Sequence, residues 1–432
     1  MVNEFIKKNL NPFIISAFII AFCVYCLGFK IKNTHIFRSL LCPLEIEFIE
    51  GKVISSPNVT SSGNFYSCKL QVFKVKSKKN QKTDAVYSLT SSSLGEISVL
   101  LPSEYVDSLK PGKLFSPVNK AFLIEEGAVI YIKGEWLEKK QCFLAQKIES
   151  AFYDQSFTGH FFYFRAMCRL LFKRLLYGWG KASSLIISLL SGSREYLDME
   201  TKENFMLSGL SHILALSGMH LSFFSGLASK AGKKMFGKKY IHYFRLAAII
   251  LFLWFAGRSP SLFRAFLCSL IMILSSWINL RSINSLTVLS FVFIIHSMIF
   301  PCDMFELAFL LSYASLAGIL LFSECINKYL CRIFPHKISS SLSASVSAQI
   351  TTSYISIKTF STLTPVGIIS TTVVSPLINL FLTLSIFSII SCLLMPFLSP
   401  VFSCILNALY EVIFFTVKFF AGFPPVSFKD KL

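Results

Sequence analysis

Long uncharged apolar runs limit what this chain can fold into more than any other feature of its sequence. From residue 155 onward they follow one another closely, and most are about long enough to cross a bilayer as a helix. Of the 432 residues, 53% are hydrophobic and only 15% are charged, whereas globular chains carry roughly 25% charged residues. The sequence therefore predicts a membrane protein and excludes a soluble enzyme, a disordered chain and a collagen-like repeat.

The charge balance is unusual for so apolar a chain. There are 42 Lys and Arg against 23 Asp and Glu, which gives a net charge of +19. Two explanations compete. Positive residues hold cytoplasmic loops on the inner side of a membrane, and they also attract polyanions such as lipid headgroups or nucleic acid.

The first apolar run covers residues 12–29 and contains no charge. No small-residue cleavage site follows it, so we interpret it as a retained anchor rather than a signal peptide. Residues 1–44 are accordingly expected to form an N-terminal membrane anchor.

Residues 45–152 differ sharply from the rest of the chain and predict a small soluble β domain. Between residues 45 and 150 there are 14 basic and 12 acidic residues and no membrane-length run. Apolar residues alternate with period two, with turn signals between the runs; they are Tyr66, Cys68, Leu70 and Val72, then Ile97, Val99 and Leu101, then Val129 and Tyr131, then Cys142 and Leu144. About five short strands suggest an OB-like barrel. Such barrels often bind oligonucleotides, but a net charge of only +2 favours a purely structural role.

Residues 153–432 are predicted to hold an interfacial helix followed by a multi-helix membrane domain. Residues 160–178 alternate cations with aromatic residues and leucines, which is typical of a helix lying in the membrane interface. The expected membrane segments are 206–228, 241–257, 262–279, 284–300, 305–323, 341–359, 364–397 and 401–422. Residues 364–397 are expected to form two segments that break near Pro376. The fold class is thus a polytopic α-helical membrane protein with a small extracytoplasmic all-β, OB-like domain near its N-terminus.

Basic loops set the expected orientation. Residues 230–245 hold six Lys and Arg, so this loop is placed in the cytoplasm. Two crossings further on comes Arg281, and two more reach a group of cations, Lys328, Arg332 and Lys337. Each falls on the inner side. Counting backward places the β domain outside, provided that the helix at 160–178 does not cross.

Cysteine and histidine spacing gives limited information. Cys68 and Cys142 lie on predicted strands of the outer domain and could form a disulfide there. The seven histidines include no H-x-H or H-E-x-x-H spacing, so no metal site and no cofactor are expected.

Polar groups inside apolar runs are the natural functional candidates, because each is costly in a membrane. The segment from Gly209 to His220 contains Ser211, His212, Ser217 and His220 in an otherwise apolar run. On an ideal helix His212 and His220 are about 80 degrees apart, so both could face one cavity. Gly209 and Gly218 would let the backbone bend or be approached closely. An alternative is a protease dyad of Ser217 and His220, but the sequence offers no clear third group.

Two further places remain ambiguous. Arg258 and Arg264 flank Pro260, and their guanidinium groups could bind phosphate bidentately or could extend to lipid headgroups. Residues 339–364 contain 14 Ser or Thr among 26 residues. Such a helix could line a hydrated passage, or its small side chains could allow close helix packing.

Several of these motifs resemble one known family. The segment GLSHILALSGMH (209–220) closely resembles the signature of the ComEC-type competence family, which forms the inner-membrane channel for single-stranded DNA in bacterial transformation. Leu190–Arg194 resembles the short G-x-R element of that family, and Ser259–Ala265 resembles its S-P-S-x-x-R-A element. Phe305–Tyr313, which includes Ser312, resembles its G-F-Q-L-S-F element but lacks the glutamine. The expected N-terminal anchor and β domain also resemble those of the family.

The resemblance implies a channel for single-stranded DNA in the bacterial cytoplasmic membrane, and not an enzyme. Arg258 and Arg264 would contact phosphates, while His212, Ser217, Gly218 and His220 would line the constriction. The metallo-β-lactamase-like nuclease domain of many members, with its H-x-H-x-D-H motif, is expected to be absent. A cytoplasmic motor, a DNA receptor and a nuclease would then be separate partners. The rival hypothesis is a transporter or flippase for a lipid or small anion.

Overall fold

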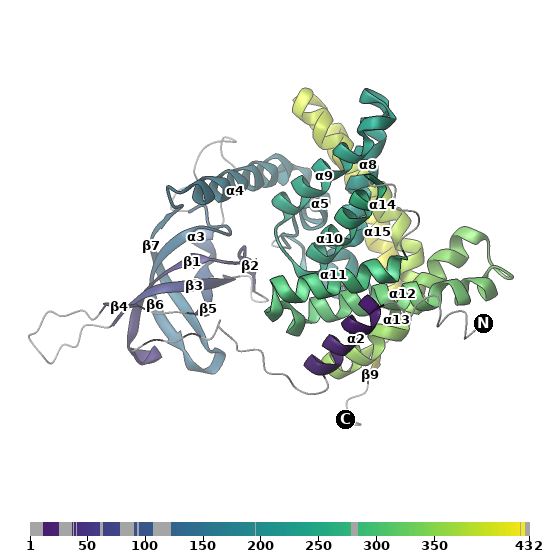
Figure 1. Cartoon of the computed structure of the whole chain (residues 1–432). Coiled ribbons are helices and arrows are strands. Elements are labelled where there is room, and N and C mark those ends of the chain that lie inside the picture. Colours follow the sequence, from purple (N-terminus) through teal and green to yellow (C-terminus); the bar gives the residue numbers. More distant parts are fainter. Residues whose placement is uncertain are drawn as a thin grey trace, which may run out of the picture. The chain divides into compact units, whose positions relative to one another are not determined.

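The computed structural model describes residues 12–25, 37, 39, 41–60, 64–77, 90–92, 95–106, 122–194, 196–277, 284–423 and 425–427. The chain divides into two compact units (Figure 1). We call Met1–Ile31, Ser188–Gly192 and Leu197–Leu432 the membrane unit, and Lys32–Ile187 with Ser193–Tyr196 the β unit. The β unit therefore continues past the expected limit at residue 152. Arg281 and residues 26–29 of the expected anchor lie outside the described residues.

A closed barrel forms the core of the β unit. Its strands are β1 (Ile46–Val53), β2 (Asn58–Val59), β3 (Phe65–Ser77), β4 (Thr90–Ser92), β5 (Glu96–Pro102), β6 (Val129–Leu137) and β7 (Cys142–Phe152), with short turns η1 (Pro43–Glu45), α3 (Ser103–Val106) and η2 (Glu138–Lys140). Because β1 pairs with both β3 and β6, the ring β1–β3–β5–β7–β6 closes, and β5 runs parallel to β7. This is the small OB-like barrel that the sequence predicts.

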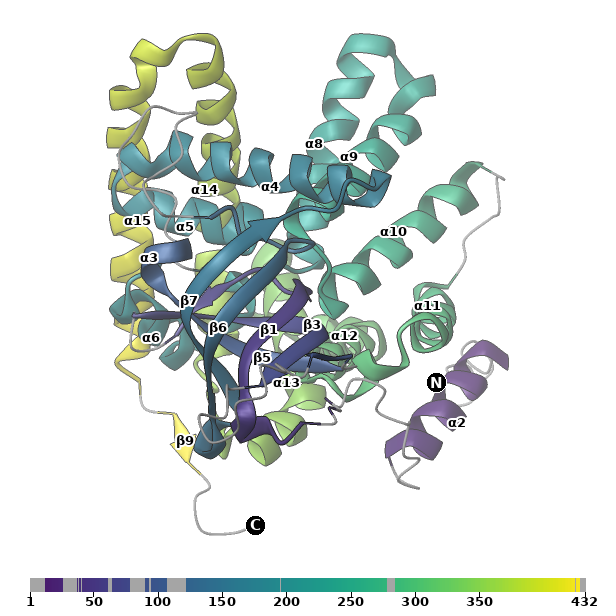
Figure 2. The same cartoon turned by 90° about the vertical axis from the view of Figure 1, so that its left-hand side faces the viewer.

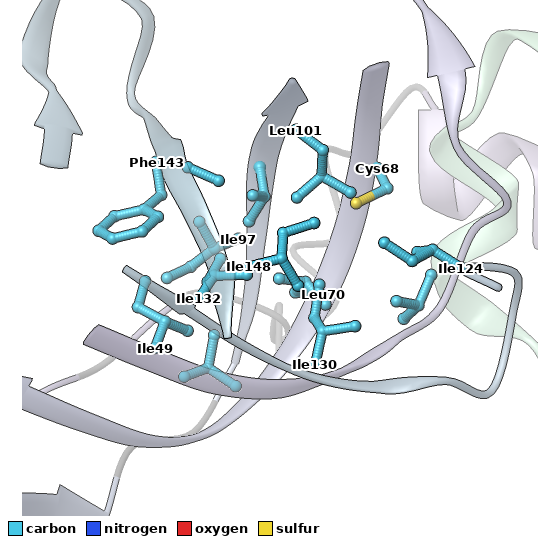
Figure 3. Close-up of a cluster of buried hydrophobic side chains, with 14 of the residues drawn as sticks. Ile49, Cys68, Leu70, Ile97, Leu101, Ile124, Ile130, Ile132, Phe143 and Ile148 are labelled. Atoms are coloured by element: carbon cyan, nitrogen blue, oxygen red, sulfur yellow. The ribbon is translucent and has the colours of Figure 1, made fainter. Parts of the chain in front are cut away.

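The barrel core confirms the predicted alternation on two strands and corrects it on two others. Tyr66 to Val72 on β3 and Ile97 to Leu101 on β5 point every second side chain into the core. On β6, however, the inward residues are Ile130 and Ile132, and on β7 they include Phe143 (Figure 3). Tyr131 is half-exposed and stacks on another ring. A slip of one residue exchanges the two faces of a strand, and β6 carries register shifts against β7.

The expected disulfide between Cys68 and Cys142 does not form, and both thiols are free. Cys68 on β3 lies opposite Val99 on β5, and Phe143 lies beside Val99 from the other side. Strand β5 therefore separates the two cysteines. Adjacent strands are about 4.8 Å apart, so residues two strands apart exceed the roughly 4.4–6.8 Å between the Cα atoms of a disulfide. Burial instead raises the pKa of the Cys68 thiol to about 12.

Helix α4 (Phe157–Leu176) belongs to the β unit and carries its cations inward. Arg169 is 2% exposed and its Nε lies 3.3 Å from Glu125 Oε1, while Lys173 Nζ lies 3.1 Å from the same oxygen. Arg165 pairs with Glu126 at 2.5 Å. The expectation that these cations extend to lipid headgroups is therefore wrong, because two carboxylates before β6 neutralise them. The outward side chains of α4 are aromatic instead, with Phe157 and Phe164 88% and 61% exposed.

Helices dominate the membrane unit, and their bounds follow the chain. They are α2 (Pro12–Tyr25), α6 (Met199–Leu207), α7 (Ser211–Leu214), α8 (Gly218–Phe236), η4 (Lys238–Tyr240), α9 (Ile241–Ala256), α10 (Pro260–Trp277), α11 (Ser285–Ile299), η5 (Pro301–Phe305), α12 (Leu307–Leu330), α13 (His336–Phe360), α14 (Gly367–Leu394), η6 (Pro396–Leu398) and α15 (Ser399–Ala421). Strands β8 (Thr362–Leu363) and β9 (Val426–Ser427) pair with each other, while η3 (Tyr177–Trp179) and α5 (Lys181–Ser191) connect α4 to this unit.

Among the described residues, five helical segments are long and apolar enough to cross a membrane. They are Lys238–Ala256, Pro260–Trp277, Leu307–Leu330, Gly367–Leu394 and Pro396–Ala421. Two shorter apolar helices accompany them. Helices α8 and α9 lie side by side as a hairpin (Figures 1 and 2). The chain is therefore a multi-pass α-helical membrane protein with a β domain, as the sequence predicts.

Two expected segments differ in the structure. The run at 206–228 is not one helix, because the backbone leaves the helical conformation between α7 and α8. The run at 364–397 does not break near Pro376, which lies inside the continuous helix α14. A proline is tolerated in a membrane helix where neighbouring groups satisfy the freed backbone carbonyl. Length and hydropathy alone do not reveal either outcome.

The hydroxyl-rich helix α13 uses its small side chains for packing against α12. A Cβ on Gly318 of α12 would lie 2.5 Å from the Ser347 carbonyl oxygen. Thr351 donates a hydrogen bond of 2.8 Å to the Ala314 carbonyl oxygen. Ser347 is fully buried and bonds within its own helix. Of the two interpretations of this segment, these contacts favour close packing.

Candidate functional site

The break between α7 and α8 places Ser217 and His220 at the start of a helix. Ser217 is the N-cap of α8 in an extended conformation. Its Oγ lies 3.2 Å from His220 Nδ1, and its amide donates to the same nitrogen over 3.3 Å. His220 is fully buried, and its Nε2 has no hydrogen-bond partner. A protease dyad needs a third group that orients the base, and none contacts this nitrogen in the described structure.

Arg264 is a buried cation beside this helix start. It lies on α10, is 8% exposed, and its Nη1 donates a hydrogen bond of 2.8 Å to the Ser312 carbonyl oxygen on α12. Its guanidinium lies 6.0 Å from the centre of the Tyr313 ring. A Cβ on Gly218 would stand 3.5 Å from Arg264 Nη2, so the absence of a side chain at Gly218 leaves room for the arginine.

The charge of Arg264 has no carboxylate partner among the residues that the structure describes. Its Nε also lacks a hydrogen-bond partner. Because the side chain is buried, it does not reach out to headgroups, which was one of the two interpretations of this arginine. An uncompensated cation at such a position attracts an anion.

Arg258 is held differently, by a carboxylate that sequence reasoning missed. Its Nη1 lies 2.8 Å from Asp303 Oδ2, and its guanidinium stacks 4.0 Å from the centre of the Phe300 ring. Asp303 lies in η5 and is 4% exposed. The side chain of Arg258 remains 43% exposed. Asp303 is the only acidic residue between Glu203 and Glu306, which is the signal that could have revealed it.

A histidine and a tyrosine extend this ion pair into the helices. His296 on α11 is fully buried, with Nε2 3.2 Å from Asp303 Oδ2 and Nδ1 3.1 Å from the Tyr313 hydroxyl. Because Tyr313 follows Ser312, the two arginines contact one short segment of α12. Ser312 also donates from its Oγ to Ser261 Oγ over 3.1 Å. We call Ser217, Gly218, His220, Arg258, Arg264, His296, Asp303, Ser312 and Tyr313 the arginine cluster.

Four sequence candidates lie elsewhere. His212 is exposed on α7 and bonds to the Gly209 carbonyl oxygen of its own turn over 3.2 Å. Since α7 ends before α8, the expected sharing of one helical face with His220 does not hold. Ser211 is exposed beside it, and Arg194 is exposed and belongs to the β unit. Gly209 has a φ of 75°, and a Cβ there would lie 2.8 Å from Gly367 Cα at the start of α14.

The described residues contain no group of three or more His, Cys, Asp or Glu side chains that could hold a metal ion. The polar chemistry of the membrane unit is therefore that of guanidinium, imidazole and hydroxyl groups around one carboxylate. Such a set is suited to binding an anion by charge and hydrogen bonds.

The comparisons with known proteins identify the family. A family model described as "Competence protein" matches residues 189–429, more than half of the chain. The fold and the match define a multi-pass membrane protein, and the chain belongs to the competence protein family. A protein of Aquifex aeolicus (strain VF5), described as an uncharacterized protein, is 27% identical over 238 residues. The chain spans about half of that relative, 54% of its length, and the match covers 55% of this chain. No solved structure matches the chain.

Proposed function

We propose that the membrane unit conducts single-stranded DNA across the cytoplasmic membrane during natural transformation. Membership of the competence protein family supports a role in DNA uptake. The observation that carries the finer proposal is Arg264, a buried cation in the membrane unit with no carboxylate partner in the described structure. A central arginine costs a membrane helix about 2.5–3.5 kcal/mol, so its presence calls for an anionic ligand.

The chemistry around Arg264 suits a phosphate backbone. A single strand carries one negative charge per nucleotide, and a guanidinium binds phosphate bidentately. Arg258 offers a second, half-exposed guanidinium. The rings of Phe300 and Tyr313 lie beside the two arginines, and aromatic rings stack with bases whatever their sequence. We propose that Ser217, Gly218, His220 and the exposed His212 complete the lining of this path.

One face of the β unit supports the same ligand. The strand registers align Lys76, Phe48, Lys133 and Lys147 in one row across β3, β1, β6 and β7. The Lys76 and Lys133 ammonium groups lie 5.6 and 5.4 Å from the Phe48 ring centre, and Tyr131 stacks on Phe48 at 5.4 Å. Cations beside stacked rings form the usual platform for single-stranded nucleic acid. We propose that this face guides the strand and lies outside the cytoplasm.

The partners in this proposal follow from energetics and orientation. The sequence contains no Walker-type GKT or GKS loop, so we propose that a cytoplasmic motor pulls the strand. A DNA receptor and a nuclease would act on the outer side. The anchor at residues 1–44, the β domain and the membrane domain would each have a separate task in this scheme.

The test compares two arginines in the membrane unit. We expect Arg264→Ala to abolish uptake of labelled DNA while the abundance of the protein stays unchanged. Arg332→Ala is the matched control, because Arg332 is exposed and lies outside the arginine cluster. Wild-type uptake in Arg264→Ala would refute the site. Unchanged transformation in a deletion strain, together with an altered lipid profile, would favour a lipid transporter instead.

A further inference from the structure

The second arginine of the cluster is neutralised before any ligand arrives. Asp303 is 4% exposed, and one of its oxygens accepts from both Arg258 and His296, at 2.8 and 3.2 Å. A phosphate approaching Arg258 must therefore compete with a carboxylate of like charge. Arg264, a few residues away on α10, meets no such competitor within the described residues.

Arg258 can exchange partners because its other side is open. Its side chain is 43% exposed, and Phe300 supports the flat face of the guanidinium at 4.0 Å. The guanidinium presents five donors, of which a single Nη1–Asp303 contact uses one. A phosphate can thus meet the remaining donors while Asp303 is still bound.

His296 removes the penalty that Asp303 would otherwise suffer when Arg258 turns away. An ionised carboxylate only accepts hydrogen bonds, so Nε2 of His296 carries the proton toward Asp303. Nδ1 then accepts from the Tyr313 hydroxyl over 3.1 Å, which fixes this tautomer. A buried carboxylate with no partner is very unfavourable, but Asp303 keeps the imidazole donor throughout an exchange.

We propose that Asp303 is the exchangeable counter-ion of Arg258, which each phosphate displaces and which recaptures Arg258 when that phosphate moves on. This inference rests on the proposed function. Conduction requires binding that is favourable enough for entry yet weak enough for release. Asp303 supplies the release, His296 keeps the carboxylate in place, and Tyr313 positions His296.

The first test measures binding of a fluorescent oligothymidine to the purified full-length protein. Asp303→Asn keeps the shape of the side chain and removes its charge, so we expect binding about two- to fivefold tighter, the range of a partly exposed ion pair. Uptake in cells should nevertheless be slower than in the wild type, because release is impaired. Arg258→Gln should weaken binding, and Arg258→Gln with Asp303→Asn should bind no more tightly than Arg258→Gln alone.

His296→Phe provides a variant with the opposite expected sign. Phenylalanine keeps a ring among the neighbouring Phe263 and Phe309 rings but offers no donor to Asp303. The carboxylate then holds Arg258 more firmly, and oligothymidine binding should weaken about two- to fivefold. This variant also decides the matter if Asp303→Asn fails to fold, since a merely structural role for the pair predicts no change in binding by the folded variant.

Three results would overturn the proposal. Asp303→Asn could bind like the wild type, its tighter binding could persist without Arg258, or its uptake rate could equal that of the wild type despite tighter binding. The proposed function fails separately, through normal uptake in Arg264→Ala, and that outcome leaves the binding data on Asp303 and Arg258 unaffected.

Discussion

At the scale of single residues, the arginine cluster depends on what surrounds each charge. Arg264 reaches a backbone carbonyl because Gly218 has no side chain, and Arg258 reaches a carboxylate that comes from a distant turn. The same residue type therefore has a permanent partner in one position and a vacancy for an anion in the other. Neither difference is visible in the local sequence around the two arginines.

Gly218 offers a graded test of the room around Arg264. A Cβ there would stand 3.4 Å from Ala265 Cβ and 3.5 Å from Arg264 Nη2, which are ordinary contacts. We expect Gly218→Ala to keep most DNA uptake. Gly218→Val adds two methyl groups that displace the guanidinium, and uptake should fall at least about tenfold, the effect of about 1.4 kcal/mol. Equal uptake by the two variants would show that Arg264 does not need this space.

At the scale of elements, close helix packing and one buried ion network hold the two units together internally. Helices α12 and α13 approach at Gly318, and α4 rests on the barrel through Glu125 and Glu126. In both cases a side chain that the sequence presents as polar is buried. Its partner comes from an element that is not adjacent in the chain.

Gly318 tests the helix packing. We expect Gly318→Ala to lower the free energy of unfolding of the detergent-solubilised protein by about 1–3 kcal/mol, because the new methyl group meets the Ser347 carbonyl and the Thr351 hydroxyl. Gly226→Ala on α8 is the matched control, because a Cβ there has nothing within 4 Å. Removing a helical glycine stabilises by roughly 0.5–1 kcal/mol, so the two changes should have opposite signs.

Glu125 tests the ion network and its pH dependence. Burial would raise the pKa of Glu125, but the charges of Arg169 and Lys173 lower it further, so the pKa lies below its usual value. A lowered pKa contributes stability above the unfolded value of about 4.3 and loses it as the pH falls further. Glu125→Gln should destabilise the β unit by about 3–5 kcal/mol at pH 7.

The measurement for Glu125 is limited proteolysis of the β unit between pH 7 and pH 3. The wild type should become more sensitive as the pH falls below about 4, whereas Glu125→Gln should be sensitive already at pH 7 and change less. Glu138→Gln is the control, because Glu138 is exposed on η2. Wild-type resistance in Glu125→Gln would contradict the role of this carboxylate.

At the scale of the whole molecule, the sequence predicts the fold class better than the details of either unit. Uninterrupted apolar runs predict membrane helices because the bilayer demands internally satisfied backbone groups, and alternation on β3 and β5 predicts the barrel. The faces of β6 and β7 were assigned wrongly, because a bulge exchanges inside and outside. The cations of α4 looked like lipid anchors, since nothing local reveals that Glu125 and Glu126 lie beneath them.

The candidate site shows the same limit. Sequence motifs predicted Ser217, Gly218, Arg258, Arg264 and Ser312, and the structure brings these residues into one cluster. His296, Asp303 and Tyr313 were missed, because their role depends on contacts between α11, η5 and α12. A histidine in an apolar helix and a lone aspartate were the available signals, but only tertiary packing joins them.

The most direct test of DNA conduction follows labelled DNA into cells of a deletion strain with and without this chain. The account predicts that deletion leaves the label outside the cytoplasm, that the wild-type chain restores its entry as single-stranded DNA, and that the Arg264→Ala chain does not. Entry of labelled DNA at the normal rate in the deletion strain would contradict it.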